Sequence, residues 1–337
     1  MRRVALGILA ASALWGQQSA LDPGGRNAQA IHALLVGFVA LLSTIFVIVI
    51  VAALVPLFRR HRGIEQEPLE RTHQPSEATE KRLGLVVGIA TVVTVVILIG
   101  LIVVSVSVGK ASQGPRRAGT GMTVEVTGNQ WWWYVRYYND NARLIAIDAN
   151  ELHVPVGQPV MIRATSNDVI HSFWVPGLQG KRDLIPSRVN TEWLQADRAG
   201  YFRGQCAEFC GLQHAHMAMW LVAHTPADFE KWLSNQLNPA VAPSNSDELR
   251  GQQVFLDSAC AICHTIRGTT AAGQVGPDLT HFASRLSIAA GTLPNNKGNL
   301  GGWIADPQNI KPGTHMATVP VKAEDVQPLL DYLESLK

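Results

Sequence analysis

Charged residues are scarce in this sequence, and their scarcity narrows the class of protein. Only 16% of the 337 residues are Asp, Glu, Lys or Arg, whereas 47% are hydrophobic. A soluble domain usually carries about 25% charged residues, so part of this chain is expected to lie in lipid. The net charge of +2 is too small for a nucleic-acid-binding protein, and no basic stripe with interleaved aromatics occurs outside the expected membrane flanks.

Cysteine is also rare, and its spacing excludes a disulfide framework. The four cysteines form two close pairs, Cys206 with Cys210 and Cys260 with Cys263. Small disulfide-stapled domains show wider and more numerous spacings. Each pair is therefore expected to belong to a site of its own.

Residues 1–20 have the pattern of a signal peptide. Two arginines precede an apolar stretch over 4–15, and Ser19 and Ala20 offer a small-residue cleavage site. We expect cleavage, with an uncleaved tail as the alternative. Neither outcome changes the rest of the interpretation, because the main membrane signal lies downstream.

Two long stretches without any charged residue follow. Residues 33–58 and 83–109 contain no Asp, Glu, Lys or Arg. At about 1.5 Å of rise per residue, a helix over either stretch exceeds the roughly 30 Å hydrocarbon core of a membrane. We expect a transmembrane hairpin over 21–110. The alternative is a buried helix of a large soluble domain, but such helices rarely stay free of charge for so long.

The basic residues between these stretches predict the orientation. Arg59, Arg60 and Arg62 open the connection, and Lys81 and Arg82 close it. The positive-inside rule places such a connection in the cytoplasm. Everything after the second stretch is then exported.

The pattern changes to short strand-like runs over residues 122–224. Runs such as 123–126, 159–164 and 220–223 are alternating or apolar and are divided by Gly, Pro, Asn and Asp. This spacing predicts a β-sandwich or barrel. A rigid scaffold of this kind suits a redox metal, because any ligand rearrangement on gaining an electron adds to the transfer barrier.

Soft metal ligands gather in two segments of this domain. His171 stands in the first, and the second begins thirty-five residues later at Cys206 and runs to Met217. Two thiolates, two imidazoles and one thioether form a ligand set suited to copper. Two cysteines on one turn can bridge two copper ions, each completed by a histidine and one further ligand. The candidate ligands are His171, Cys206, Glu208 through its carbonyl, Cys210, His214 and Met217.

Three alternatives compete with copper at these cysteines: a disulfide, a zinc site and a redox dithiol. Neither a disulfide nor zinc explains a methionine placed three residues after His214. His216 is next to Met217 and is expected to point elsewhere, as a surface or interface residue.

These motifs together carry a family resemblance. They are the two apolar stretches, Gln130-Trp131, His-Ser-Phe-Trp-Val-Pro over 171–176, Asp-Leu-Ile-Pro-Ser-Arg over 183–188, and the string over 206–217. Over about residues 30–235 the chain resembles subunit II of the haem-copper cytochrome c oxidases. The resemblance implies a cupredoxin-like fold and a dinuclear copper centre, CuA, held by the six candidate ligands. It also implies that the Glu208 side chain helps to hold magnesium at the boundary with subunit I.

The resemblance assigns further roles near the copper. Trp131 follows Gln130 as in the family, where this tryptophan lies at the electron-entry surface, so it is the candidate electron-transfer residue. Trp132 and Trp133 are instead expected in the sandwich core or in a membrane-interface belt. Asp168 matches an acidic family position near the copper, with a solvated loop aspartate as the alternative.

The second apolar stretch departs from the family at its start. Family members often place a glutamate there, followed by a Trp-Thr and Pro pattern, whereas Glu80 is followed by Lys-Arg-Leu-Gly. We therefore interpret Glu80 as a residue of a solvated loop and not as the entrance of a proton channel.

A linker rich in Pro, Ser and Asn over 238–246 separates the copper domain, 111–237, from a last domain over 247–337. Asp247 is expected to cap a helix that ends near residue 256. The motif Cys260-Ala-Ile-Cys263-His264 then follows, which is typical of covalent haem c attachment, with a stray match or a dithiol as the alternative. Both cysteines would form thioethers to the haem while the histidine binds the iron.

The surrounding residues resemble a class I cytochrome c domain, which is all-α. Gly276-Pro277 follows the motif, and a last helix is expected over about 323–336. Met316 is the only methionine after the motif and is the candidate sixth haem ligand, with His315 as its rival. His/Met ligation raises the haem potential. In the family, Pro277 supports the carbonyl that orients the haem-binding histidine.

A copper subunit that carries its own cytochrome c resembles the caa-type oxidases. The expected fold is a multidomain membrane protein with two transmembrane helices, a cupredoxin-like β-domain and a cytochrome c domain. The expected function is electron entry from an external cytochrome c, through haem c and CuA, to subunit I, beside subunit III, in a bacterial inner membrane. The copper and haem domains would lie on the periplasmic side.

Two other functions stay open. One is a copper-containing nitric oxide reductase subunit, and the other is a membrane-anchored electron carrier or copper-delivery protein. A nitrous oxide reductase is disfavoured because it needs a second, histidine-rich copper cluster, and the remaining histidines are scattered. A quinol-oxidase subunit is disfavoured because that group lacks the copper ligands.

Overall fold

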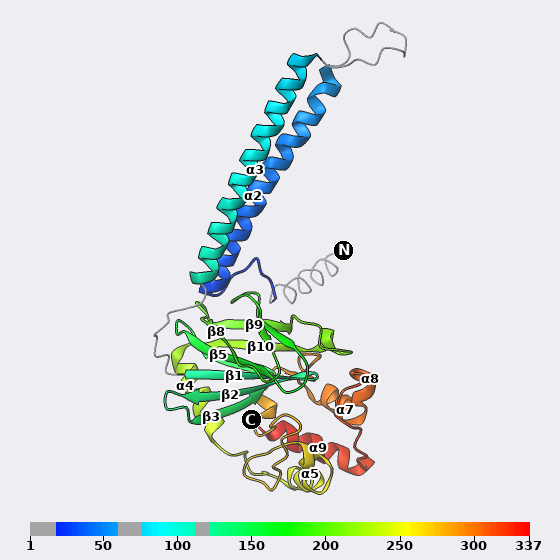
Figure 1. Cartoon of the computed structure of the whole chain (residues 1–337). Coiled ribbons are helices and arrows are strands. Elements are labelled where there is room, and N and C mark those ends of the chain that lie inside the picture. Colours follow the sequence, from blue (N-terminus) through cyan, green and yellow to red (C-terminus); the bar gives the residue numbers. More distant parts are fainter. Residues whose placement is uncertain (1–17, 60–75, 112–121) are drawn as a thin grey trace, which may run out of the picture. The chain divides into compact units, whose positions relative to one another are not determined.

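A computed structural model describes residues 18–59, 76–111 and 122–337 of the chain. The chain forms two compact units, one of residues 30–113 and the other of the remaining residues (Figure 1). Nearly all of the expected signal peptide lies outside the described residues, and so does most of the basic connection between the two apolar stretches.

The first unit is built from two long helices, α2 (Arg26–Arg59) and α3 (Glu77–Ala111). Each has a window of mean hydropathy 3.0 or more, and none of either window is buried within the described chain. Both helices are long and apolar enough to cross a membrane, as expected. Each helix is longer at both ends than the predicted charge-free stretches, 33–58 and 83–109. The polar and charged residues that flank these stretches are also helical.

Glu80 is a correction to the sequence interpretation. It lies in the first turn of α3, together with Glu77, and not in a loop. Acidic side chains are favoured there because the first turn of a helix carries a partial positive charge. The side chain is exposed in the described chain.

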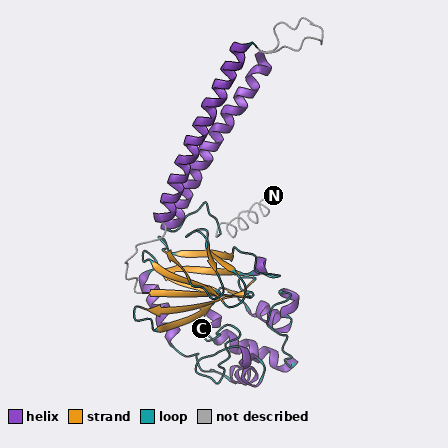
Figure 2. Ribbon diagram, viewed as in Figure 1, coloured by secondary structure: helices purple, strands orange, loops and turns teal. Residues whose placement is uncertain are grey.

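The β-domain consists of two five-stranded sheets (Figure 2). The first has the order β3-β2-β1-β5-β8, and the second has the order β4-β10-β9-β6-β7. The strands of the first are β1 (Met122–Asn129), β2 (Trp132–Asn139), β3 (Leu144–Ala149), β5 (Val160–Ser166) and β8 (Asn190–Leu194). Those of the second are β4 (Glu151–Pro155), β6 (His171–Trp174), β7 (Arg182–Leu184), β9 (Gly200–Cys206) and β10 (Ala218–His224). The sandwich expected over 122–224 is confirmed.

The alternation of side chains along β2 decides whether Trp132 or Trp133 enters the core. Along β2 the buried positions are Trp133, Val135 and Tyr137, because successive side chains of a strand face opposite sides. Trp133 packs edge-on against Phe173 with ring centroids 6.4 Å apart. Trp132 points to the opposite face and lies outside this core, so the sequence prediction is right for Trp133 and wrong for Trp132. Helix α4 (Pro226–Leu237) follows the last strand and contacts the sandwich.

The C-terminal domain is mainly helical. Its elements are α5 (Ser246–Asp257), α6 (Cys260–Cys263), η2 (Phe282–Ser284), β11 (Ser287–Ile288), β12 (Leu293–Pro294), α7 (Lys297–Ala305), α8 (Pro307–Ile310) and α9 (Ala323–Ser335). Helix α5 packs on α9, and Phe255 meets Tyr332 edge-on with centroids 6.4 Å apart. Asn245, not Asp247, caps α5: its side chain accepts hydrogen bonds from the backbone of Asp247 and Glu248.

The α5–α9 contact requires glycine at position 251. A Cβ atom at Gly251 would lie 2.0 Å from the Pro328 carbonyl oxygen. We expect Gly251→Ala to destabilise the domain by about 1–3 kcal/mol, because the two backbones would have to move apart. Denaturant unfolding of the full chain followed by circular dichroism measures the loss.

Gly298→Ala is the matched control. The nearest atom to a Cβ there is Asn296 Oδ1 at 3.6 Å, so the substitution should leave stability unchanged or raise it slightly. Equal unfolding midpoints for the Gly251 and Gly298 variants would contradict this packing.

Candidate copper and haem sites

The first candidate site lies where three strands of the second sheet meet a loop. Strand β9 ends at Cys206, β10 begins at Ala218, and the short helix η1 (His214–His216) lies in the loop between them. The backbone N–H of Cys206 donates to the Met217 carbonyl at 2.9 Å, which closes this loop. Strand β6 pairs with β9 and begins at His171, so the distant histidine is brought beside the loop.

All six predicted ligands come together where this loop meets the start of β6. The sulfur of Cys206 lies 3.8 Å from that of Cys210, 3.9 Å from His171 Nδ1 and 3.2 Å from the Glu208 carbonyl oxygen. The sulfur of Cys210 lies 3.6 Å from His214 Nδ1 and 3.9 Å from Met217 Sδ. His171, Met217 and both cysteines are almost completely buried. The site is therefore a largely buried cluster of thiol, imidazole and thioether groups with one carbonyl oxygen.

The two thiols interact but are not bonded to each other. Both cysteines are free, and their 3.8 Å separation far exceeds the roughly 2.05 Å of a disulfide. The hydrogen bond from the Cys210 thiol is the main cause that lowers the pKa of Cys206 to about 3, and the neighbouring thiolate raises the pKa of Cys210. A thiophilic metal bound here would displace the thiol protons and gain two thiolate ligands.

Asp168 contacts the nitrogen of the His171 ring that faces away from Cys206. Its carboxylate accepts a hydrogen bond of 2.8 Å from His171 Nε2 and one of 2.6 Å from the backbone N–H of Gln130. Burial opposes ionisation of Asp168, but hydrogen bonds from His171, Val169 and Gln130 outweigh it and lower its pKa. Burial similarly opposes protonation of His171, while bonds to Asp168 and Cys206 raise its pKa. A carboxylate on one ring nitrogen turns the other toward the pocket, which favours the copper-neighbour interpretation of Asp168 over the solvated loop.

Gln130 and Trp131 lie in the connection between β1 and β2 of the first sheet. Both donate hydrogen bonds to the loop over residues 207–217, which is called the copper loop below. The indole Nε1 of Trp131 donates to the Cys210 carbonyl at 2.9 Å, and Gln130 Nε2 donates to the same oxygen at 2.8 Å. Trp131 is only 8% exposed. The predicted electron-transfer residue is therefore anchored to a candidate ligand.

The Glu208 side chain is partly exposed beside the copper loop. Its carboxylate pairs with Lys181 Nζ at 3.2 Å, and the same ammonium lies 3.7 Å from Asp183. These carboxylates raise the pKa of Lys181. Glu208 and Asp183 therefore form a pair of carboxylates whose charge Lys181 offsets only in part.

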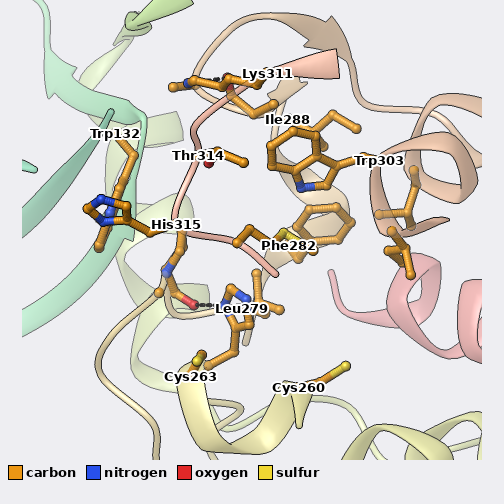
Figure 3. A pocket seen from close by; sticks show the side chains of 18 of the residues that line it. Trp132, Cys260, Cys263, Leu279, Phe282, Ile288, Trp303, Lys311, Thr314 and His315 are labelled. Atoms are coloured by element: carbon orange, nitrogen blue, oxygen red, sulfur yellow. Dashed lines mark hydrogen bonds between the residues drawn. The ribbon is translucent and has the colours of Figure 1, made fainter. Parts of the chain in front are cut away.

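The second candidate site is a cavity of about 230 Å³ in the C-terminal domain. Cys260, Cys263 and His264 line it together with apolar side chains (Figure 3). Figure 3 shows both cysteines at one end of the cavity, on α6, with Ile288 and Trp303 toward the other end. An apolar cavity with two thiols and one imidazole matches the donor set that covalent haem c requires.

His264 is held in a defined orientation. Its Nδ1 donates to the Pro277 carbonyl at 2.8 Å, as the family resemblance implies, which leaves Nε2 as the nitrogen available to a metal. Burial is the main cause that lowers its pKa, so the ring is held neutral and ready to bind. Gly276 lies against the ring: a Cβ there would be 2.6 Å from His264 Cε1.

Both candidates for the sixth haem ligand line the cavity, but they differ in their neighbours. His315 lies 6.0 Å from Trp131, measured between ring centroids. Figure 3 shows the His315 ring turned toward Trp132 and away from Cys260 and Cys263. Met316 lines the cavity from the next position in the chain.

The copper domain contributes to the wall of the haem cavity, which the sequence did not predict. Its contributing residues are Gln130, Trp131, Trp132 and Asn150. Trp132 is therefore neither core nor membrane belt. The available signal was the run of three tryptophans, since strand alternation must turn the middle one away from the core.

Sequence reasoning also missed a buried charged cluster at the contact between the two domains. Asp148, Glu151 and His153 have ligand atoms within 4.8 Å of one another. Arg285 of the C-terminal domain donates to Asp148 at 2.9 Å, with both side chains buried, and His153 Nδ1 lies 2.8 Å from His224 Nε2. Burial, followed by the His153 charge, lowers the pKa of His224 to about 4. The arginine already neutralises Asp148, so the cluster is an ion-pair contact between domains.

Comparison with known families assigns a family to the β-domain and another to the C-terminal domain. Residues 138–224 match a family described as cytochrome c oxidase subunit II, periplasmic domain, and residues 249–337 match cytochrome c. The first match covers the copper loop, and the second covers Cys260, Cys263, His264 and Met316.

Curated relatives and solved structures extend the comparison. A cytochrome c oxidase subunit 2 of Alkalihalophilus pseudofirmus is 32% identical over 324 residues, which are 95% of this chain and 91% of the relative. One of Bacillus sp. (strain PS3) is 32% identical over 83% of this chain and 80% of its own. The crystal structure of the periplasmic domain of subunit II of a Bradyrhizobium japonicum cytochrome oxidase is 32% identical over 35% of this chain and 94% of that chain, with a TM-score of 0.32. The chain belongs to the cytochrome c oxidase subunit II family, in the form that carries a cytochrome c domain at its C-terminal end.

Proposed function

We propose that this subunit receives electrons on its own haem c, passes them to a dinuclear CuA centre, and delivers them to the haem-copper subunit I for oxygen reduction coupled to proton pumping. The observation that carries the proposal is the convergence of five side chains and one carbonyl, each within 4 Å of a cysteine sulfur. Thiolate, imidazole and thioether donors together suit copper better than zinc or a disulfide.

The residues around the pocket would fix the copper ligands. His171, Cys206, Glu208, Cys210, His214 and Met217 are the proposed ligand set. Asp168 would orient His171, and the buried sandwich beneath the loop would keep water out. A copper pair held here would supply a one-electron site whose charge is spread over two metals, so that little ligand movement accompanies each electron.

The C-terminal cavity would hold haem c. Cys260 and Cys263 would form the two thioethers, and His264 would bind the iron through Nε2, since Nδ1 is occupied by the Pro277 carbonyl. Met316 is the proposed sixth ligand. His315 is a poorer candidate because its ring lies beside Trp131.

Trp131 is the proposed residue between the two sites. It lines the haem cavity and donates its indole N–H to the carbonyl of the copper ligand Cys210. This single side chain therefore contacts the surroundings of both centres. Its hydrogen bond to the Cys210 carbonyl, together with that of the neighbouring Gln130 to the same oxygen, would limit motion during transfer.

Helices α2 and α3 would anchor the subunit in the inner membrane, with the copper and haem domains on the periplasmic side. Subunits I and III and an external cytochrome c are the proposed partners. Magnesium is proposed at the boundary with subunit I, where the Glu208 carboxylate would have to exchange its contact with Lys181 for the metal.

Met217→Leu tests the copper assignment. Removal of the thioether should change the copper EPR spectrum and leave the haem absorption spectrum unaltered, because Met217 belongs only to the copper pocket. Met219→Leu is the control, since Met219 is also completely buried but lies outside the proposed ligand set. Identical copper spectra for wild type and Met217→Leu would count against the ligand set.

Met316→Leu and His315→Leu together identify the sixth haem ligand. Loss of Met316 should convert the low-spin haem to a largely high-spin form and lower its potential, since a thioether ligand raises it. His315→Leu should keep the low-spin spectrum. Absorption and magnetic circular dichroism spectra of the intact subunit distinguish the two, and the reverse pattern would assign the role to His315.

A further inference from the structure

We propose that Lys311 sets the docking position of the haem domain on the copper domain, so that electrons cross between the two sites in a fixed arrangement without movement of the haem domain. This inference rests on the function proposed above, because it assumes that both centres are present in one chain. It concerns a positioning residue: Lys311 borders the haem cavity but belongs to neither proposed ligand set.

Lys311 is a buried lysine whose hydrogen bonds join the two domains. Its side chain is 2% exposed. The ammonium donates to the carbonyls of Trp131 at 2.8 Å, His216 at 2.8 Å and Ala289 at 3.1 Å. An ammonium has three N–H donors, so these three acceptors satisfy it. Two of them belong to the copper domain, and the third belongs to the haem domain.

Because the amino group of Lys311 is buried, the contact favours one position of the haem domain on the copper domain. Removal from water is the main cause that lowers the pKa of Lys311 to about 7. No carboxylate pairs with it among the residues that the structure describes. A buried cation is tolerated only where its donors are satisfied, and here the three carbonyls converge only when the domains are in this register. Such a group gives specificity of position more than it gives binding energy.

The position of Lys311 couples the ligand loops of the two sites. It stands five residues before Met316, in the segment that would carry the sixth haem ligand. Its acceptor His216 lies between His214 and Met217 in the copper loop, and Gln213 of the same loop donates to the Pro312 carbonyl at 2.7 Å. The contact therefore joins the two ligand loops directly.

A second group of contacts holds the domains together elsewhere. Arg285 pairs with Asp148 at 2.9 Å, and the backbone N–H of Ala218 donates to the Ala290 carbonyl, also at 2.9 Å. The backbone N–H of Leu286 donates to the Glu151 carboxylate. Because Arg285 and Leu286 add contacts to those of Lys311, rotation of the haem domain about Lys311 is restrained.

The transfer itself needs only distance and orientation. One electron would pass from a haem held in the C-terminal cavity to a copper pair held by the proposed ligands. The haem would be oxidised and the copper pair reduced, with no bond formed or broken and no proton moved. Docking that holds Trp131 between the sites therefore fixes the distance and orientation that electron transfer requires. If the haem domain had to move first, the transfer rate would depend on solvent viscosity.

The test compares Lys311→Leu with wild type in the purified complex, with Lys322→Leu as the control because Lys322 is an exposed lysine of the same domain. Haem-to-copper electron transfer is followed after rapid photoreduction in buffers of increasing glycerol content. We expect the wild-type and control rates to be independent of viscosity. The Lys311→Leu rate should fall at least tenfold or become dependent on viscosity.

Hydrogen exchange supplies a readout that does not depend on electron transfer. The amides of Ala218 and Leu286 bond across the interface, so they should exchange faster in Lys311→Leu and at the wild-type rate in Lys322→Leu. Lys311→Gln, which keeps two N–H donors without the charge, should show smaller effects on both measurements.

The outcomes separate this inference from the proposed function. Absence of the copper or haem spectrum in wild type would refute the function. Intact spectra with wild-type transfer rates and exchange in Lys311→Leu would refute the role of Lys311. If Lys311→Leu does not assemble, Lys311→Gln and wild type decide: a wild-type rate that falls as viscosity rises overturns the fixed arrangement, and a rate that does not change supports it.

Discussion

The structure depends on keeping two thiols close together, buried and unbonded at one end of a β-sandwich. The antiparallel pairing of β9 with β10 returns the chain at the right place, and β6 delivers His171 from thirty-five residues earlier in the sequence. The 3.8 Å between Cys206 and Cys210 leaves both sulfurs free for a metal. Everything proposed for this subunit follows from a scaffold rigid enough to hold that pair, because a thiol pair that could close would form a disulfide outside the cytoplasm.

The haem domain completes this arrangement from outside the sandwich. It covers Trp131, shares a cavity wall with the copper domain, and inserts Lys311 against the copper loop. The same tryptophan contacts the carbonyl of Cys210, a proposed copper ligand, and also lines the proposed haem cavity. The two domains of this chain therefore carry matching contact surfaces, one on each domain.

The sequence predicted the features that local pattern controls. Strand alternation and turn residues gave the sandwich over 122–224, and charge-free length gave two helices able to span a membrane. The ligand motifs named side chains that the fold brings together, around Cys206 and Cys210 in one domain and around the cavity in the other. The cap of α5 was missed because Asn245 and Asp247 are both good caps and only backbone geometry chooses between them. Strand alternation could have shown that Trp132 leaves the core, but not that it lines the haem cavity. That cavity wall, the contacts of Lys311 with Trp131 and the Arg285–Asp148 pair could not be predicted, because each joins residues more than a hundred positions apart.

Metal analysis combined with EPR of the intact, copper-loaded subunit tests the central claim most directly. The account predicts two coppers per chain that share a single unpaired electron, beside one low-spin haem. Zinc at this position, or a covalent bond between the sulfurs of Cys206 and Cys210 in the loaded protein, would contradict it.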